Sequence, residues 1–109
     1  MRRLPAFVLA AFAATAPTAL HAQEAGDPLL GRRLARSECA ACHAVEPGEA
    51  RSPNGFAPTF MAVATTSGIS AMALYAFLQT PHADMPDLVL KPDEIRNVVA
   101  YILSLQQSR

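Results

Sequence analysis

Both cysteines of this 109-residue chain stand in one short segment, Cys39-Ala40-Ala41-Cys42-His43, with a histidine directly after the second. Two cysteines cannot build a disulfide-dense scaffold, so that class of small fold is excluded. Two thiols three positions apart, followed by an imidazole, can instead bind together to one bulky cofactor. The segment therefore favours a fold that wraps around a cofactor.

The first 22 residues form a separate segment with the pattern of a secretory signal peptide. Arg2 and Arg3 supply a positive start, and residues 4–20 carry no charge and are rich in alanine. A small residue, Ala22, then precedes the expected cleavage point. We therefore expect residues 1–22 to be removed on export and the protein to reach the periplasm.

A retained transmembrane anchor is the alternative for this segment. Spanning a bilayer takes about 20 consecutive apolar residues. The uncharged run is shorter and contains Pro5 and Pro17, which favours cleavage. The mature chain is then expected to be one domain of residues 23–109, without a transmembrane segment.

The expected mature chain is small and nearly neutral. It has 87 residues, with seven Lys and Arg residues against nine Asp and Glu residues, a net charge of −2. A chain of this size gains little stability from its core alone, and a buried cofactor would add to it. The charge gives no basic surface for nucleic acid and is too small for strong electrostatic steering of a partner.

Apolar spacing and breaker residues predict an all-α fold with three main helices and one short helix. Asp27 and Pro28 are good first residues for a helix that runs to about Glu38. The last helix is predicted to start near Pro92. Its apolar residues fall at helical spacing: Ile95, Val98, Val99, Ile102 and Leu103.

The middle of the chain carries the other two helices. Residues 46–55 are punctuated by proline and glycine and read as a loop. A short helix is predicted over residues 59–65. Ser70 is a good N-cap for a further helix that ends before Pro81. No alternating strand pattern and no βαβ unit are found.

The cysteine-histidine segment has the spacing of the attachment motif for c-type haem. Two thiols three positions apart can each add to one of two vinyl groups on the same edge of a porphyrin, and the adjacent imidazole can turn under the ring toward the iron. The small Ala40 and Ala41 leave room beside the porphyrin edge. Covalent haem attachment takes place in exported compartments, which agrees with the signal peptide. We therefore predict one haem c, attached at Cys39 and Cys42, with His43 as an axial ligand of its iron.

A redox-active dithiol and a structural zinc site are the alternatives for these residues. A thioredoxin-like dithiol belongs near a βαβ unit, which the sequence lacks. Structural zinc takes four ligands, and Cys39, Cys42 and His43 supply three, two of them adjacent in the chain. Both alternatives fit less well than haem.

The second axial position of the iron has several candidates. Met85 lies in a loop between two predicted helices, and Pro86 after it can stiffen that loop. His82 in the same loop is the main rival, and an open sixth position is a third alternative. Met61 and Met72 fall in apolar helical stretches, where a methionine usually fills the core. We therefore predict Met85 as the sixth ligand.

With these features the chain resembles the class I c-type cytochromes, small monohaem proteins with His and Met axial ligands. The resemblance covers nearly all of residues 27–107. The family has a glycine in its first helix, eight residues before the first haem cysteine, which Gly31 matches. It also has an aromatic residue in the last helix that packs there, which Tyr101 matches. Because glycine has no side chain, the two helices are expected to cross closely.

The resemblance also implies a second contact to the axial histidine. In the family, a proline carbonyl in the loop after the haem motif accepts a hydrogen bond from the ligand histidine, and Pro58 stands at the matching position. This bond would fix the His43 ring and raise its basicity. The Met85-Pro86 pair matches the sixth-ligand segment of the family.

Two positions depart from the family pattern. Ala35 stands where an aromatic residue is often found, four positions before the first haem cysteine, so a thinner helix contact is expected. Lys91 replaces the Ser or Thr that usually caps the last helix, and lysine is a poor cap. Neither position touches the expected haem ligands.

These features imply an electron-transfer protein rather than an enzyme: a periplasmic carrier that passes one electron at a time between redox protein donors and acceptors. Weak docking is expected at the haem edge, against small residues such as Ala40 and Ala41, because redox encounters use small interfaces. The chain is expected to be a monomer or a subunit of a redox complex. The alternatives are a cytochrome subunit of a substrate-oxidising dehydrogenase complex and a peroxidase-like haem enzyme with an open sixth site.

Overall fold

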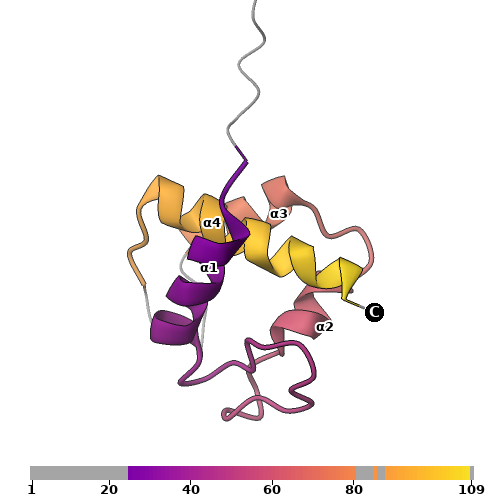
Figure 1. Cartoon of the computed structure of the whole chain (residues 1–109). Helices are drawn as coiled ribbons and strands as arrows, with labels where there is room; N and C mark the ends of the chain where they lie inside the picture. The colour runs from indigo at the N-terminus through magenta and orange to yellow at the C-terminus, as the bar shows by residue number, and fades with distance from the viewer. Residues whose placement is uncertain (1–24, 81–84, 86–87, 109) are drawn as a thin grey trace, which may run out of the picture.

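Helices make up all the regular secondary structure in the residues that the computed structural model describes, 25–80, 85 and 88–108 (Figure 1). No strand occurs in these residues, and the predicted all-α class is confirmed. No helix in the described ranges is long and apolar enough to cross a membrane. The expected signal peptide lies outside them. In chain order the elements are α1 (Pro28–Leu34), η1 (Ala35–Cys39), α2 (Phe60–Ala64), α3 (Ala71–Gln79), α4 (Pro92–Ser104) and η2 (Leu105–Gln107).

The first helix begins where the sequence predicts, because Asp27 caps it and Pro28 occupies its first turn. The Asp27 carboxylate accepts hydrogen bonds from the backbone N–H groups of Leu29 at 2.8 Å and Leu30 at 3.3 Å. α1 passes directly into η1, a wider π-helical turn. The helical path therefore continues to Cys39 and presents the first cysteine at its end.

Hydroxyl caps set the starts of the two middle helices. The Thr59 hydroxyl accepts a hydrogen bond from the Ala62 N–H at 3.0 Å at the start of α2. The Ser70 hydroxyl accepts one from the Ala73 N–H at 3.1 Å at the start of α3. Both helices therefore begin within one residue of the predicted positions.

The last helix, α4, has Lys91 at its cap position, where the lysine side chain has no oxygen to accept a hydrogen bond. Its third residue compensates, because the Glu94 carboxylate accepts a hydrogen bond from the Lys91 backbone N–H at 2.8 Å. Pro92 in the first turn also favours a helix start. Glu94 and Pro92 in the first turn thus partly compensate for the missing side-chain cap at Lys91.

The helices α1 and α4 lie against each other in close contact (Figure 1). A Cβ atom built on Gly31 would lie 1.9 Å from the backbone oxygen of Asn97 and 2.9 Å from the Cβ atom of Tyr101. The close crossing of Gly31 and Tyr101 is therefore confirmed. Ala35, the first residue of η1, is fully buried in the core.

The core lies mainly along α4, which buries five of its residues: Ile95, Val98, Val99, Tyr101 and Ile102. From α3, Leu74 is buried against this core. Met61 packs on its edge, as expected of a core-filling methionine. The same prediction for Met72 is wrong, because its side chain is 83% exposed. Met72 is two residues before Leu74, and residues two apart point to nearly opposite faces of a helix.

Candidate haem-binding site

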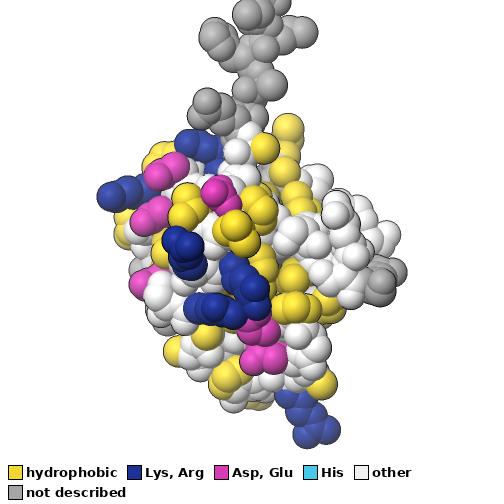
Figure 2. All heavy atoms as spheres, in the orientation of Figure 1, with side chains coloured by type: hydrophobic (Ala, Val, Ile, Leu, Met, Phe, Trp, Pro, Cys, Tyr) yellow, Lys and Arg dark blue, Asp and Glu magenta, His cyan; other side chains and the backbone are white. Residues whose placement is uncertain are grey.

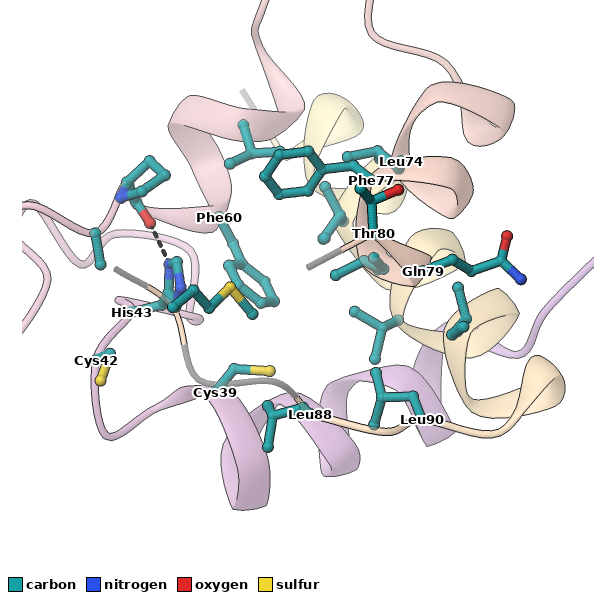
Figure 3. A pocket seen from close by; sticks show the side chains of 18 of the residues that line it. Cys39, Cys42, His43, Phe60, Leu74, Phe77, Gln79, Thr80, Leu88 and Leu90 are labelled. Carbon is teal, nitrogen blue, oxygen red and sulfur yellow. Dashed lines mark hydrogen bonds between the residues drawn. The ribbon is translucent and has the colours of Figure 1, made fainter. Parts of the chain in front are cut away.

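A cavity of about 1080 Å³ lies among α3, α4 and the segment that carries the two cysteines (Figure 3). Cys39, Cys42 and His43 line it on one side, and Leu74 and Phe77 of α3 line it on another. Its volume is slightly above the roughly 300–1,000 Å³ typical of ligand pockets. The cavity can therefore hold a large group in contact with both thiols and the imidazole.

The backbone turns sharply between the first cysteine and the histidine. The carbonyl oxygen of Cys39 accepts hydrogen bonds from the N–H groups of Cys42 at 3.1 Å and His43 at 2.9 Å. These two bonds close the turn at the end of η1. The turn brings three residues of the motif, spaced over five positions, to one cavity.

The His43 ring is held at its outer nitrogen. Its Nδ1 atom lies 2.7 Å from the carbonyl oxygen of Pro58, the contact expected from the sequence. A carbonyl only accepts hydrogen bonds, so Nδ1 must carry the proton and donate. The other nitrogen, Nε2, then keeps its lone pair free of a proton, which is the form that binds a metal.

Met85 lines the same cavity as His43 and is half-buried. Met61 and Met72 do not line it. The rival His82 and the neighbouring Pro86 lie outside the described residues. The cavity therefore contains an imidazole and a thioether among its described lining residues, and the choice of Met85 over His82 as the sixth ligand stays a prediction.

Residues 26–102 match the family described as cytochrome C oxidase, cbb3-type, subunit III. The chain belongs to this family of c-type cytochromes. Cytochrome c-552 of Bradyrhizobium diazoefficiens is 38% identical to it over 82 residues, which is 75% of this chain and 78% of that protein. No solved structure gives a significant match. The predictions of a class I c-type cytochrome and of covalently bound haem c with its iron are confirmed by the family.

The described lining suits a haem group in the cytochrome. No Asp, Glu, Lys or Arg side chain is among the described lining residues, so most of the wall is apolar, as a porphyrin ring requires. Thiols of Cys39 and Cys42 are present for thioether links, and His43 offers its Nε2 lone pair. Besides His43 and the thiols, the polar side chains of the described lining are uncharged: Asn54, Gln79 and Thr80.

The state of the first cysteine argues against a redox-active dithiol. Burial, helped by the charge of Glu38, raises the pKa of the Cys39 thiol to about 11. Reactive cysteines of dithiol oxidoreductases have lowered pKa values instead. Zinc is also disfavoured, because no group of three or more His, Cys, Asp or Glu side chains in the described part of the chain is arranged to hold a metal ion.

Two neighbours of the site were not predicted from the sequence. The Phe60 ring lies against the His43 ring, with centroids 5.6 Å apart and planes at 58° (Figure 3). The Tyr101 hydroxyl, expected only as part of a helix contact, donates a hydrogen bond to the Val45 carbonyl. Phe60 stands two residues after Pro58, so its place beside the histidine could have been inferred from the proline contact. The Tyr101 hydrogen bond joins residues 56 positions apart, and no local sequence pattern predicts it.

Proposed function

We propose that this cytochrome is a periplasmic carrier that passes one electron at a time between larger redox proteins. The observation that supports this most is that His43 and Met85 line the same apolar cavity. Two protein ligands on one iron would leave no open position for a substrate. An axial pair that stays bound in both oxidation states suits electron transfer rather than catalysis.

Each residue of the site has a distinct part in the proposed carrier. Cys39 and Cys42 would hold the haem covalently, and the haem iron would supply the one-electron redox change. His43 would bind the iron through Nε2, while Pro58 fixes the ring by accepting the Nδ1 proton in a hydrogen bond. Met85 would be the sixth ligand. The apolar lining would exclude water from the ring and stabilise the cofactor.

Docking in this proposal is weak and depends little on charge. No Asp, Glu, Lys or Arg occurs in the sequence between Arg51 and Asp84, a stretch that supplies much of the described cavity lining. On the face that Figure 2 shows, most basic and acidic side chains lie on the side of α1, and few lie on the opposite side. Ala40 and Ala41 between the cysteines would lie at the contact. Electron-transfer rates that fall several-fold with modest salt would contradict this docking mode.

A second candidate is a cytochrome subunit of an oxidase or dehydrogenase complex. The observation that favours it is the family match, since that family is described as a subunit of a cytochrome oxidase. The experiment is purification from a whole-cell extract solubilised with a mild detergent. A carrier elutes alone at the size of one chain, whereas a subunit co-purifies with the rest of its complex in fixed ratio.

The remaining alternative is a peroxidase-like enzyme with an open sixth position. The absorption spectrum of the ferric protein separates it from the carrier, because a thioether bound to ferric iron gives a weak band of its own. We expect the band in the purified protein. Its absence, together with rapid binding of added cyanide or azide, would reject Met85 as a ligand and favour the enzyme.

A further inference from the structure

A closed circuit of contacts ties the His43 ring to α4. The His43 ring lies against the Phe60 ring, and the Phe60 ring lies against the Tyr101 ring, with centroids 5.6 Å and 6.3 Å apart. The Tyr101 hydroxyl then donates a hydrogen bond to the Val45 carbonyl at 2.5 Å. Val45 is two residues after His43, so the backbone completes the circuit. The imidazole and the backbone that bears it are thus both linked to the same tyrosine.

Three members of this circuit, other than His43 itself, are shielded from water. Phe60 is 6%, Tyr101 4% and Val45 2% exposed. A hydrogen bond in such a place is stronger than one in water, and a carbonyl left without its donor there costs free energy. Burial also raises the pKa of Tyr101, so its hydroxyl remains a donor throughout the neutral range.

The backbone next to His43 has further anchors on both sides of residue 44. The Ala44 N–H donates to the Ser52 hydroxyl at 3.0 Å, and the Ala44 carbonyl accepts from the Phe60 N–H at 2.9 Å. Phe60 therefore touches this region twice, once through its backbone and once through its ring. With the backbone held, the freedom that remains is rotation of the imidazole itself.

The hydrogen bond to Pro58 leaves part of that freedom open. With the backbone held, the imidazole can still change its two side-chain torsions, and one hydrogen bond at Nδ1 does not fix both of them. A second ring packed against the imidazole restrains the torsion that remains. We propose that Phe60 and Tyr101 are positioning residues for the axial imidazole of His43: Phe60 sets the plane of the ring, and Tyr101 holds the backbone that carries it. This proposal rests on the proposed function, in which His43 binds the haem iron.

The test uses the haem-loaded ferric protein and proton NMR. Hyperfine shifts of the haem methyl groups report the plane of the axial imidazole, and the exchange rate of the His43 Nδ1 proton with solvent reports local opening. Phe60→Leu, which keeps an apolar side chain, should change the order or spread of the methyl shifts. Tyr101→Phe removes one buried hydrogen bond of about 0.5–1.5 kcal/mol and should speed the proton exchange by roughly two- to tenfold.

Two controls separate positioning from general loss of stability. Val99→Ala also removes buried apolar volume from α4, but Val99 does not line the cavity. Tyr75→Phe removes a half-buried tyrosine hydroxyl on α3. Both controls should keep the wild-type methyl pattern and the wild-type Nδ1 exchange rate, even where thermal unfolding shows lower stability.

Different results would reject the positioning role and the proposed function. Wild-type methyl shifts in Phe60→Leu, or unchanged proton exchange in Tyr101→Phe, would overturn the positioning role while leaving His43 as a ligand. If His43 in the wild-type protein carries no hyperfine shift, histidine ligation itself fails. Tyr101→Phe keeps the aromatic ring and the Cβ atom that lies near Gly31, so this variant is expected to fold even if Phe60→Leu does not.

Discussion

The Arg32 guanidinium donates two hydrogen bonds to one carboxylate oxygen of Glu46, from Nε at 3.0 Å and from Nη2 at 2.6 Å. Arg36, one helical turn later, donates to the other oxygen of the same carboxylate. Glu46 is three residues after the haem-motif histidine, so arginines of α1 and η1 hold the end of the segment that carries His43. This cluster of three charged side chains therefore connects α1 and η1 to the segment that carries His43.

This arrangement predicts a specific loss of stability in acid. Hydrogen bonds from Arg32 and then Arg36 hold the pKa of the Glu46 carboxyl below its usual value of about 4.3. The folded state therefore favours the ionised carboxylate. The stabilisation is fully present above the usual pKa and is lost as the pH falls from there through the lowered pKa. The effect should be small, because the Arg32 side chain is 41% exposed and solvent screens the pair.

Thermal unfolding of Glu46→Gln across this acid range is the measurement. The variant should be less stable than the wild type at neutral pH and should lose less stability on acidification. Glu38→Gln removes the same charge from the nearby η1 segment and serves as the control. Equal acid sensitivity of the wild type and Glu46→Gln would contradict the assignment, and added salt should narrow the difference between them.

Substitution of Gly31 tests the close crossing of α1 and α4. In Gly31→Ala the added Cβ atom would lie 1.9 Å from a backbone oxygen of α4, so the two helices must move apart. We expect a loss of about 1–3 kcal/mol, the usual cost of overpacking. Gly55→Ala is the matched control, because no atom lies within 4 Å of the position of its Cβ. Urea unfolding of both variants measures the difference, and equal stability would refute the close-packing account.

The parts of the fold that local chemistry determines could be predicted from the sequence. Asp27 and Ser70 cap their helices through hydrogen bonds to residues two or three positions away, so the relevant partners lie in the same short window. The orientation of a helix within the fold is a different matter. Met72 and Leu74 are both apolar, and only packing against α4 decides that Leu74 is buried and Met72 exposed.

In the candidate site, too, the local features could be predicted from the sequence and the long-range contacts could not. The attachment motif and the proline acceptor could be placed from spacing and family resemblance, because both lie within one continuous segment. The contacts that hold this segment from outside could not. Arg32 and Glu46 are 14 positions apart, and Tyr101 and Val45 are 56 positions apart. Such pairs depend on the path of the whole chain, which no local signal encodes.

The cap of α4 offers a stabilising substitution. Lys91→Ser would place a hydroxyl where the first-turn N–H groups of α4 need an acceptor, while its backbone N–H could still donate to Glu94. We expect a gain of about 0.5–1 kcal/mol, since Glu94 already supplies part of the capping. Denaturant unfolding is the measurement, with Lys91→Ala as the control for loss of the lysine. A serine variant no more stable than the alanine variant would count against this cap analysis.

The choice of sixth ligand is decided by comparing Met85→Ala with His82→Ala. If Met85 binds the iron, Met85→Ala should retain the haem, because the proposed thioether links involve Cys39 and Cys42 and not Met85. Its reduction potential should fall, since a thioether favours ferrous iron and axial ligands shift haem potentials over a range of about 0.8 V. The ferric protein should also bind added azide or imidazole. His82→Ala should leave both properties near those of the wild type. Potentiometry and ligand titration of the two variants measure this contrast, and a large change in His82→Ala with none in Met85→Ala would assign the axial pair to His43 and His82.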